Sequence, residues 1–298
     1  MNPSTLSTCA LLILCATLVA CGAKQTAVDA EEQAKAQATD DLNAAATDVK
    51  AAAAGGSLDT ILASDLRTGK ERDGARHPKQ TLEFFGVTPD KKVLEIWPGS
   101  GWYSQILVPY VGPTGNLSVT NYVEGVGSDY VQKRTTTYNQ WLAGMTDGSK
   151  VKVVPVNPPD ALNFGEDGAY DVVLTFRNIH NWMKGGYDRE IYAQAFRTLK
   201  PGGIFGVVEH RGVPGTSRED SIKSGYVPQD VVIKDVEAAG FKLVATSEIN
   251  ANPKDTKDHA MGVWTLPPAL KMGETDRAKY EAIGESDRMT LKFMKPEQ

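Results

Sequence analysis

The sequence Lys92-Val-Leu-Glu95-Ile-Trp-Pro-Gly99-Ser-Gly101-Trp-Tyr103 joins a short apolar run to a turn that contains two glycines. The apolar run is typical of a buried strand, and a helical pattern over residues 102–110 follows the turn. Glycines in such a turn let a ligand approach the backbone closely, and the amide groups at the start of the helix supply hydrogen-bond donors. This stretch therefore predicts a strand, a ligand-binding turn and a helix, in that order.

Similar apolar runs recur along the chain, with helical patterns between them. The expected strands cover residues 92–97, 115–121, 151–156, 170–176, 203–209, 241–248 and 288–295. The expected helices cover residues 58–66, 77–85, 102–110, 128–142, 187–199 and 228–239. This alternation predicts an α/β fold, a Rossmann-like, doubly wound, mainly parallel sheet of seven strands with helices on both faces. Residues 249–287 have no strong strand signal, and a segment of that length is usually a functional loop or lid.

The first 20 residues differ from the rest of the chain. They carry no charged side chain, and residues 10–20 form an uninterrupted apolar run. A helix that crosses about 30 Å of hydrocarbon needs about 20 apolar residues, so this run predicts a signal peptide over residues 1–20 rather than a membrane span. Leu18-Val-Ala-Cys21 resembles the lipobox of bacterial lipoproteins. The resemblance implies cleavage before Cys21 and lipidation of its thiol.

The lipobox resemblance also predicts a location. It implies an exported protein that is lipid-anchored to the membrane on its periplasmic face. Gly22 rather than Asp follows Cys21, which favours the outer membrane where a cell has two. Residues 21–56 are rich in alanine and hold no aromatic side chain, so we expect a solvated tether. Residues 57–298 then form the α/β domain, and the lipid anchor is its expected contact with a membrane.

Composition excludes cysteine chemistry and nucleic-acid binding. Of the three cysteines, Cys9 and Cys15 lie in the predicted signal peptide, and Cys21 is the predicted lipidation site. The domain therefore offers no thiol for a disulfide, a zinc site or nucleophilic catalysis. The formal net charge is -5 and the basic residues form no cluster, so the sequence predicts no nucleic-acid partner.

Polar residues follow several of the other expected strands. Asp160 and Ala161 follow the third strand, and the fourth leads into Asn178-Ile-His180-Asn-Trp182. A Leu199-Lys-Pro-Gly-Gly203 turn precedes the fifth strand, which ends in Glu209-His210-Arg211. Open α/β sheets bind ligands at the carboxyl ends of their strands. We therefore expect these polar residues to share one site.

With these motifs, residues 79–296 resemble class I S-adenosylmethionine-dependent methyltransferases. The most specific elements are the Tyr-Asp-Val-Val strand at residues 170–173, the His-Asn-Trp that follows it, and the Leu-Lys-Pro-Gly-Gly turn. The Trp-Pro-Gly-x-Gly turn at residues 97–101 is similar to that of a group of often exported (lipoprotein) methyltransferases. The resemblance implies the sheet order 3-2-1-4-5-7-6 with strand 7 antiparallel, S-adenosyl-L-methionine as cofactor, and a small-molecule substrate.

The same resemblance assigns cofactor-binding residues. Glu95 matches the acid that orients the glycine turn, Asp160 the acid that contacts the adenine amino group, and Asn178 the residue beneath the methionine moiety. The full set is Glu95, Trp97, Gly99, Gly101, Tyr103, Asn121, Glu124, Asp160, Ala161 and Asn178.

Two positions depart from the family pattern. Trp97 stands where the family has its first glycine, so this turn is expected to approach a ligand in a different way. Asn121 replaces the acid that would hold both ribose hydroxyls, and Glu124, three residues later, is the candidate substitute. An asparagine side chain donates and accepts hydrogen bonds but lacks the charge-assisted bond of a carboxylate.

For catalysis, His180 is the first candidate for a general base, followed by Glu209 and His210. Methyl transfer depends chiefly on alignment of the reacting atoms, with at most one base that removes a proton. Trp182 and Arg211 are the expected substrate contacts. A solvated surface turn is the alternative interpretation of residues 209–211.

Two further side-chain clusters have more than one interpretation. His180, Glu209 and His210, joined by His259, can assemble a metal site, but no short His-x-x-x-His spacing supports one, and no metal is predicted. The charged residues between the first two expected helices are more typical of a solvated helix face than of a cover over the cleft. They are Arg67, Arg72, Asp73, Arg76 and His77.

Three functions stay open on the sequence alone. The leading hypothesis is a lipid-anchored, exported methyltransferase. S-adenosylmethionine is made in the cytoplasm, whereas the signal sends the domain out of it. The second hypothesis is therefore a non-catalytic ligand-binding or scaffold protein on a methyltransferase fold, since a fold does not determine a function. The third is a metal-assisted hydrolase that uses His180, Glu209 and His210.

Overall fold

A computed structural model describes residues 56–297 of the chain. The predicted signal peptide, the predicted lipidation site at Cys21 and nearly all of the predicted tether lie outside the described residues. Those three features therefore stay predictions.

An eight-stranded sheet occupies the centre of the described domain, in the order β3-β2-β1-β4-β5-β8-β7, with β6 paired to β5 off this path. The strands are β1 Val93–Ile96, β2 Leu117–Tyr122, β3 Lys152–Val156, β4 Tyr170–Phe176, β5 Leu199–Gly212, β6 Val227–Pro228, β7 Lys242–Ser247 and β8 Arg288–Met294. Strand β8 pairs antiparallel with β5 and β7, whereas the pairs among β1 to β5 are parallel. The predicted fold and order are confirmed, with β6 as an added two-residue strand.

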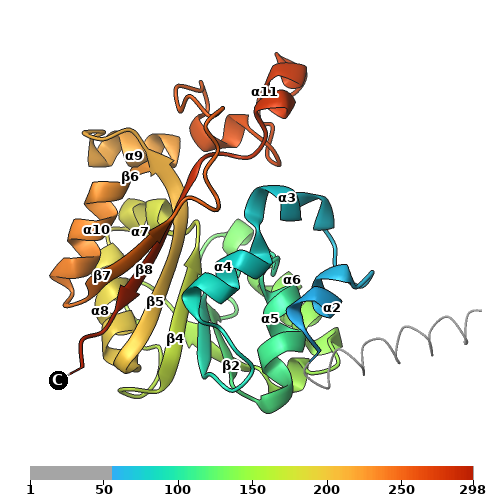
Figure 1. The fold of residues 1–298 in the computed structure, drawn as a ribbon, viewed down its shortest axis with the longest axis vertical. Helices are drawn as coiled ribbons and strands as arrows, with labels where there is room; N and C mark the ends of the chain where they lie inside the picture. Colours follow the sequence, from blue (N-terminus) through green and yellow to red (C-terminus); the bar gives the residue numbers. More distant parts are fainter. Residues whose placement is uncertain (1–55, 298) are drawn as a thin grey trace, which may run out of the picture. The chain divides into compact units, whose positions relative to one another are not determined.

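Helices cover both faces of this sheet (Figure 1). The α-helices are α2 Leu58–Ala63, α3 Asp73–Arg76, α4 Pro78–Phe85, α5 Ser104–Val111, α6 Asp129–Gly144, α7 Ile179–Gly185, α8 Asp188–Thr198, α9 Arg218–Ser224, α10 Gln229–Ala238 and α11 Arg277–Ile283. Short 3-10 turns add η1 Lys70–Arg72, η2 Gly112–Thr114, η3 Gly148–Lys150 and η4 Gly262–Thr265. The six predicted helices are present, while α3, α7, α9 and α11 were not predicted.

Two hydrophobic clusters, one on each face of the sheet, form the core. Helices α2, α4, α5 and α6 pack on one face, and α7, α8 and α10 pack on the other. Neighbouring strand residues alternate between the faces: Val172 and Leu174 belong to the first cluster, and Val173 belongs to the second. This alternation follows from the two-residue period of a strand, and it explains why the strands read as continuous apolar runs.

Serine caps define the start of three helices. The Oγ of Ser57, Ser128 and Ser217 each accepts a hydrogen bond from the backbone amide three residues later, at α2, α6 and α9. Such a cap satisfies one of the amides that the first helical turn leaves without a partner.

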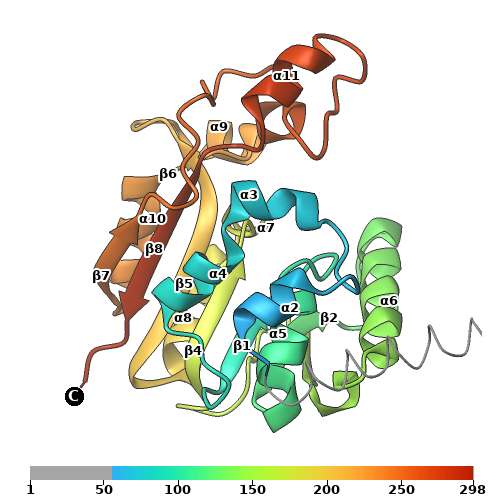
Figure 2. The same ribbon diagram turned by 45° about the vertical axis from the view of Figure 1, so that its right-hand side comes forward.

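The segment between β7 and β8 lies beyond the carboxyl end of β5, on the same side of the domain as α3 (Figures 1 and 2). It contains η4 and α11 and, as predicted, no strand. Glu285, near its end, forms ion pairs with Arg72 of η1 and Arg76 of α3. The first and last parts of the domain therefore meet over this end of the sheet.

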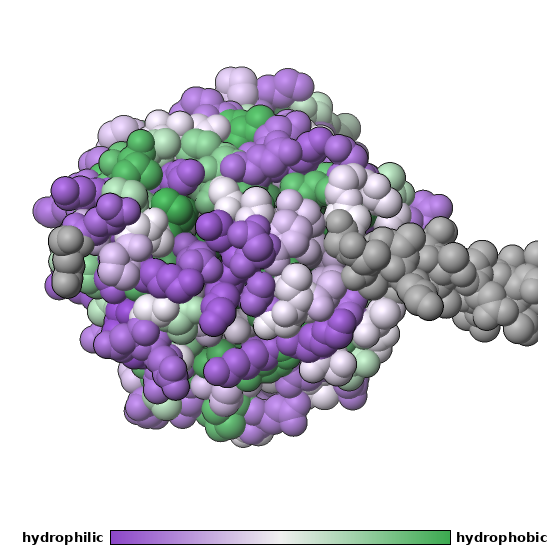
Figure 3. Space-filling view, turned by 60° about the horizontal axis from the view of Figure 1, so that its bottom comes forward, coloured by the Kyte–Doolittle hydropathy of each residue, from purple (hydrophilic) through white to green (hydrophobic). Residues whose placement is uncertain are grey.

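Within residues 56–297, no helix combines the length and the apolar character that a membrane crossing requires. On the face shown in Figure 3, hydrophilic residues predominate and hydrophobic residues form small separate areas. Large exposed apolar side chains are scattered along the chain: Tyr130 lies on α6, whereas Leu66 and Met261 lie in loops.

Candidate functional site

The glycine turn after β1 is held from behind by a buried acid. Glu95 is fully buried at the end of β1, and its Oε2 accepts a 2.6 Å hydrogen bond from Ser104 Oγ at the start of α5. Tyr138 of α6 lies 3.1 Å from the same serine oxygen. Burial raises the pKa of Glu95 to about 7, against the opposing effect of the Ser104 hydrogen bond. Glu95 thus links β1, α5 and α6 and does not face solvent.

The two glycines of the turn have different surroundings. Both have the left-handed φ that favours glycine, +66° at Gly99 and +79° at Gly101. A Cβ on Gly101 would meet the rings of Trp141 and Tyr138 at 3.2 Å, whereas a Cβ on Gly99 would meet only the end of the Arg134 side chain. Gly101 is therefore needed for packing against α6, and Gly99 is the glycine with room for a ligand.

A cavity of about 420 Å³ opens beside Gly99. Gly99 and Ser100 border it on one side, and α6 borders it on the other through Tyr130, Lys133, Arg134, Thr137, Tyr138 and Trp141. A volume of this size is typical of small-molecule sites.

Trp97, at the first glycine position, has a φ of +46°, which is unusual for a large residue. Its ring is buried and lies 5.3 Å from Tyr122, 5.9 Å from Trp182 and 6.2 Å from Tyr187, measured between ring centroids. Its indole N–H is buried and has no hydrogen-bond partner among the described residues. Buried donors without a partner are rare in folded proteins, so this indole N–H is a candidate contact for a ligand acceptor.

Asn178, in the turn after β4, connects the turn after β4 to the end of β1. Its Nδ2 donates to the carbonyl oxygens of Ile96 and Trp97, at 3.0 and 3.2 Å, and lies 3.2 Å from Thr175 Oγ1. The side chain therefore positions the turn that carries Trp97.

The two candidate ribose contacts after β2 are joined through α6. Asn121 Nδ2 donates to Asn139 Oδ1 at 3.1 Å, and Asn139 Nδ2 donates to Glu124 Oε1 at 2.9 Å. Asn121 is buried and its Oδ1 accepts from the amide of Tyr122, whereas Glu124 is exposed. Of the two, Glu124 retains the accessible carboxylate oxygen.

The remaining cofactor candidates lie on the loop after β3 and at the start of α5. Asp160 and Ala161 are exposed, and an isolated bridge pairs Ala161 with Asn157. Tyr103 is buried, and its ring stacks on Phe176 with centroids 3.5 Å apart.

His180, Glu209 and His210 come together at the carboxyl ends of β4 and β5. His180 Nδ1 lies 3.2 Å from Oε1 of the fully buried Glu209. The backbone amides of His210 and Ile179 also donate to the Glu209 carboxylate, at 2.7 and 2.6 Å. The alternative of a solvated surface turn is therefore wrong for Glu209 and His210. A carboxylate that holds Nδ1–H leaves Nε2 of His180 as the basic nitrogen.

His210 remains uncharged in this environment. Its ring is buried, and Nδ1 lies 2.5 Å from Ser286 Oγ. Burial, together with the neighbouring His180, Arg177 and Arg288, holds the pKa of His210 well below its usual range.

The same three side chains are close enough to hold a metal ion. One ligand atom from each of His180, Glu209 and His210 lies within 4.8 Å of the others. The three residues come from the ends of two neighbouring strands, β4 and β5, where polar residues are expected to share one site. The three hydrogen bonds that Glu209 accepts occupy much of its capacity as a ligand.

The two expected substrate contacts, Trp182 and Arg211, both interact with other parts of the protein. Trp182 is 2% exposed and belongs to the core cluster on the α7 side of the sheet. Arg211 pairs with Glu248 at 2.7 Å and with Asp287 at 2.9 Å, and so ties β5 to the segment before β8. Both side chains are therefore engaged in holding the fold.

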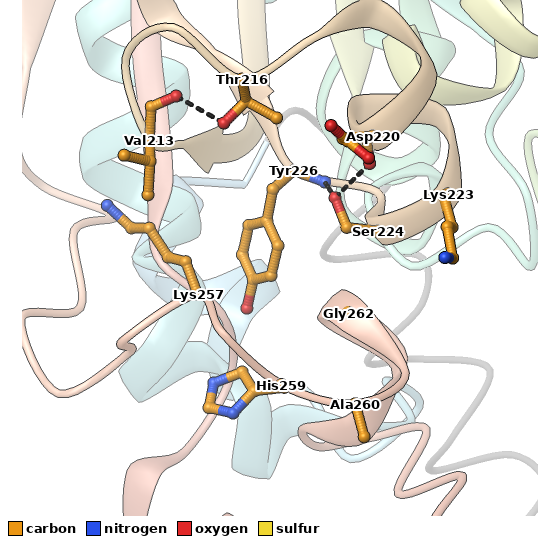
Figure 4. A pocket seen from close by; sticks show the side chains of 10 residues that line it. All are labelled: Val213, Thr216, Asp220, Lys223, Ser224, Tyr226, Lys257, His259, Ala260 and Gly262. Atoms are coloured by element: carbon orange, nitrogen blue, oxygen red, sulfur yellow. Dashed lines mark hydrogen bonds between the residues drawn. The ribbon is translucent and has the colours of Figure 1, made fainter.

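A second cavity, of about 320 Å³, lies at the end of β5 next to α9 (Figure 4). Tyr226, Lys257 and His259 line it, and the hydroxyl of Tyr226 bonds to the buried Asp255. The Tyr226 and His210 rings lie 6.4 Å apart, so this cavity neighbours the His180–His210 group.

The sequence did not predict an arginine cluster around Glu285. The expected solvated face between α2 and α4 is wrong for Arg67 and Arg76, which are 5% and 2% exposed. Arg76 and Arg288 both pair with Glu285 there, and Arg177 stands directly after β4. A charged residue directly after an apolar strand, as at Arg177, was the available signal.

Comparisons with known proteins agree with this architecture. The chain is 26% identical over 224 residues to a sterol 24-C-methyltransferase of Yarrowia lipolytica, and 26% identical over 222 residues to one of Gibberella zeae. Each match covers 68% of this chain but only 54% and 52% of those enzymes, so the chain spans about half their length. No protein-family model matches the chain.

Among solved structures, the [4+2]-cyclase SpnF superimposes with a TM-score of 0.54 at 17% identity, over 79% of this chain and 86% of that one. This likeness concerns the fold. Together with the sheet order and the antiparallel β8, it shows that the chain has the Rossmann-like fold of class I S-adenosylmethionine-dependent methyltransferases.

Proposed function

We propose that the protein transfers a methyl group from S-adenosylmethionine to a small molecule, with His180 as the general base. The buried His180–Glu209 pair supports this function most directly. It stands at the carboxyl ends of β4 and β5, where open α/β sheets bind their ligands. The matched sterol methyltransferases add support from sequence, although the chain covers only about half of each.

The residues around the glycine turn fit the proposed cofactor. The cavity beside Gly99 has a suitable volume, and the partnerless indole N–H of Trp97 is a donor for a ligand acceptor. Gly99 and Ser100 would hold the cofactor through their backbone, with Glu124 as the candidate for the ribose and Asp160 for the adenine. When bound, S-adenosylmethionine supplies a methyl group activated by a sulfonium.

The chain itself positions the base. Glu209 accepts from His180 Nδ1, which fixes the ring and leaves Nε2 to take a proton from the substrate atom that receives the methyl group. His180 is 5% exposed, and Trp264 meets its ring edge to face at 5.8 Å, so water has little access to it. General-base catalysis of this kind contributes roughly 100- to 10,000-fold in rate.

The proposal includes the location inferred from the sequence, an exported lipoprotein held by Cys21. Its support is the apolar run and lipobox of residues 10–21. A site outside the cytoplasm requires S-adenosylmethionine there, so cofactor binding is the decisive measurement.

Calorimetric titration of the purified full-length chain with S-adenosylmethionine tests the proposal. We expect binding at one site. With methyl-labelled cofactor and a small-molecule extract, His180→Gln should lower label transfer at least about 100-fold while cofactor binding is retained. No detectable binding by the unaltered chain would overturn the proposal in favour of a ligand-binding or scaffold protein.

Metal-assisted hydrolysis is a second candidate, favoured by the 4.8 Å grouping of His180, Glu209 and His210. It predicts tight binding of Zn²⁺ that is lost in His210→Gln, and an activity that a chelator removes. Methyl transfer by the proposed route predicts no effect of the chelator.

A further inference from the structure

One carboxylate serves three arginines at the end of the domain that carries His180. Glu285 accepts from Arg72 Nε at 2.6 Å, Arg76 Nε at 3.0 Å and Arg288 Nη2 at 2.8 Å. Arg76 and Arg288 are 2% and 3% exposed. Because arginine keeps its charge at neutral pH, the group carries an excess of buried positive charge.

Several donors of this arginine cluster have no acceptor. The Nη2 atoms of Arg72 and Arg76 are buried and have no hydrogen-bond partner among the described residues. Leaving a buried charged donor without a partner costs more than leaving a neutral one. A guanidinium with a free Nη2 suits one oxygen of a carboxylate or phosphate.

Arg177 adds a fourth cation to the group. Its side chain is half-buried, its pKa is lowered chiefly by burial and by the charge of Arg288, and no ion pair holds it within residues 56–297. Its backbone adopts a left-handed φ of +61° immediately after β4, while its amide donates to Val208 of β5 at 2.7 Å. A strained backbone conformation at a residue other than glycine is a feature that concentrates at functional sites.

The arginine cluster adjoins the proposed catalytic group. Arg177 directly follows Phe176 of β4, which pairs with Val208 of β5, the residue before Glu209, and Arg288 of β8 stands opposite His210 of β5 in the sheet register. A molecule held by the arginines would therefore lie next to His180.

We propose that Arg72, Arg76, Arg177 and Arg288 bind the anionic group, a carboxylate or a phosphate, of the small-molecule substrate. That the anion belongs to a substrate rests on the proposed function, whereas the anion site itself does not. An anion bound there offsets the excess charge and takes up the free guanidinium donors. One carboxylate does not neutralise the three arginines that it pairs with, and Arg177 adds a further positive charge.

Anion binding to the purified full-length chain, without cofactor, tests this proposal. The probes are inorganic phosphate and benzoate, titrated at constant ionic strength and followed by calorimetry and by thermal unfolding. We expect at least one probe to bind and to raise the Tm. Which one binds distinguishes a phosphate-bearing from a carboxylate-bearing substrate.

Arg177→Gln is the diagnostic variant. Arg177 forms no ion pair among the described residues, so replacing it leaves no carboxylate without a partner. It should weaken the binding of the probe at least about tenfold and should raise the Tm in anion-free buffer, since it removes one of the excess positive charges. Arg277→Gln is the matched control, because Arg277 pairs only with exposed acids on and near α11, and it should leave both values unchanged.

Glu285→Gln provides an independent variant. It removes the carboxylate that competes for the arginines, so the affinity for the anion should increase. Failure of both probes to bind the unaltered chain overturns the proposal, and so does equal binding by Arg177→Gln. Loss of S-adenosylmethionine binding with anion binding intact would instead refute only the proposed function.

Discussion

Ser104 Oγ lies 2.6 Å from Oε2 of Glu95, and this hydrogen bond connects the end of β1 to the start of α5 across the glycine turn. The acid that the family resemblance assigns to the turn is therefore buried, with a pKa raised to about 7 by burial. Near neutral pH it gains or loses a proton at the base of the proposed cofactor site.

This pair predicts a pH-dependent contribution to stability. A carboxyl whose pKa rises on folding holds its proton more tightly in the folded state. Its contribution is therefore full below the ordinary value of 4.5 and is lost as the pH rises through about 7. Glu95→Gln keeps the shape of the side chain without the charge. The free energy of unfolding of the variant minus that of the unaltered chain should therefore increase by about 3 kcal/mol from acid to mildly alkaline pH.

Denaturant unfolding across that pH range measures the difference. His210 has the opposite sign, because its lowered pKa removes stability as the pH falls, but it is present in both proteins and cancels. Glu83→Gln, at an exposed position of α4, controls for the change of side chain. A constant difference at all pH values would contradict the assignment.

The two glycines of the turn should separate folding from binding. Gly99→Ala adds strain of about 1–2 kcal/mol and fills space beside the cavity, so the affinity for S-adenosylhomocysteine should fall at least about tenfold. Gly101→Ala should lower the Tm further, because its Cβ meets Trp141 and Tyr138.

Gly115→Ala is the control for the strain alone. Gly115 has a φ of +73° and open space around it, in the turn before β2. Gly115→Ala should lose about as much stability as Gly99→Ala, but its affinity for S-adenosylhomocysteine should be unchanged. Equal affinities in Gly99→Ala and Gly115→Ala would place the ligand elsewhere.

The Asn121–Asn139–Glu124 chain of hydrogen bonds predicts which residue meets the ribose. Glu124→Gln removes the accessible carboxylate, and the affinity for the cofactor should fall by the difference between charged and neutral hydrogen bonds, about 1 kcal/mol or about fivefold. Asn121→Asp should bring little gain, because its side chain is already engaged by Asn139. Titration calorimetry of both variants decides, and a gain in Asn121→Asp alone would reverse the assignment.

The lipobox predicts the behaviour of Cys21. Cys21→Ser should abolish labelling by a radioactive fatty acid and leave the protein uncleaved or released from membranes, because the thiol is the lipid acceptor. Cys15→Ser, within the same apolar run, should be labelled normally. A Cys21→Ser protein of mature size that still sediments with membranes would refute the anchor.

The sheet could be predicted because each buried strand, such as Tyr170–Phe176, is a continuous apolar run between turn signals. The two-residue β6 and the short α3 and α11 carry too little periodicity to be recognised. The proximity of His180 to Glu209 followed from strand ends that meet at one edge.

The arginine cluster could not be predicted in the same way. Arg72 and Glu285 are 213 residues apart, and each alone resembles an ordinary surface charge. The engagement of Asn121 and Arg211 by neighbouring side chains is likewise invisible in the sequence, because it depends on α6 and on the segment before β8.

The pairing of Arg72 and Arg76 with Glu285 also bears on the order in which the domain assembles. Contacts between the first and last parts of a chain form late, because the loop between them must be ordered first. A chain made or exported from its amino end would contain β1 and the glycine turn early. Arg72 and Arg76 would pair with Glu285 only after residue 285 had been made or exported. Premature termination near the carboxyl end would therefore leave the buried charges of this region without their partner, and such a product should be a preferred target for proteolysis.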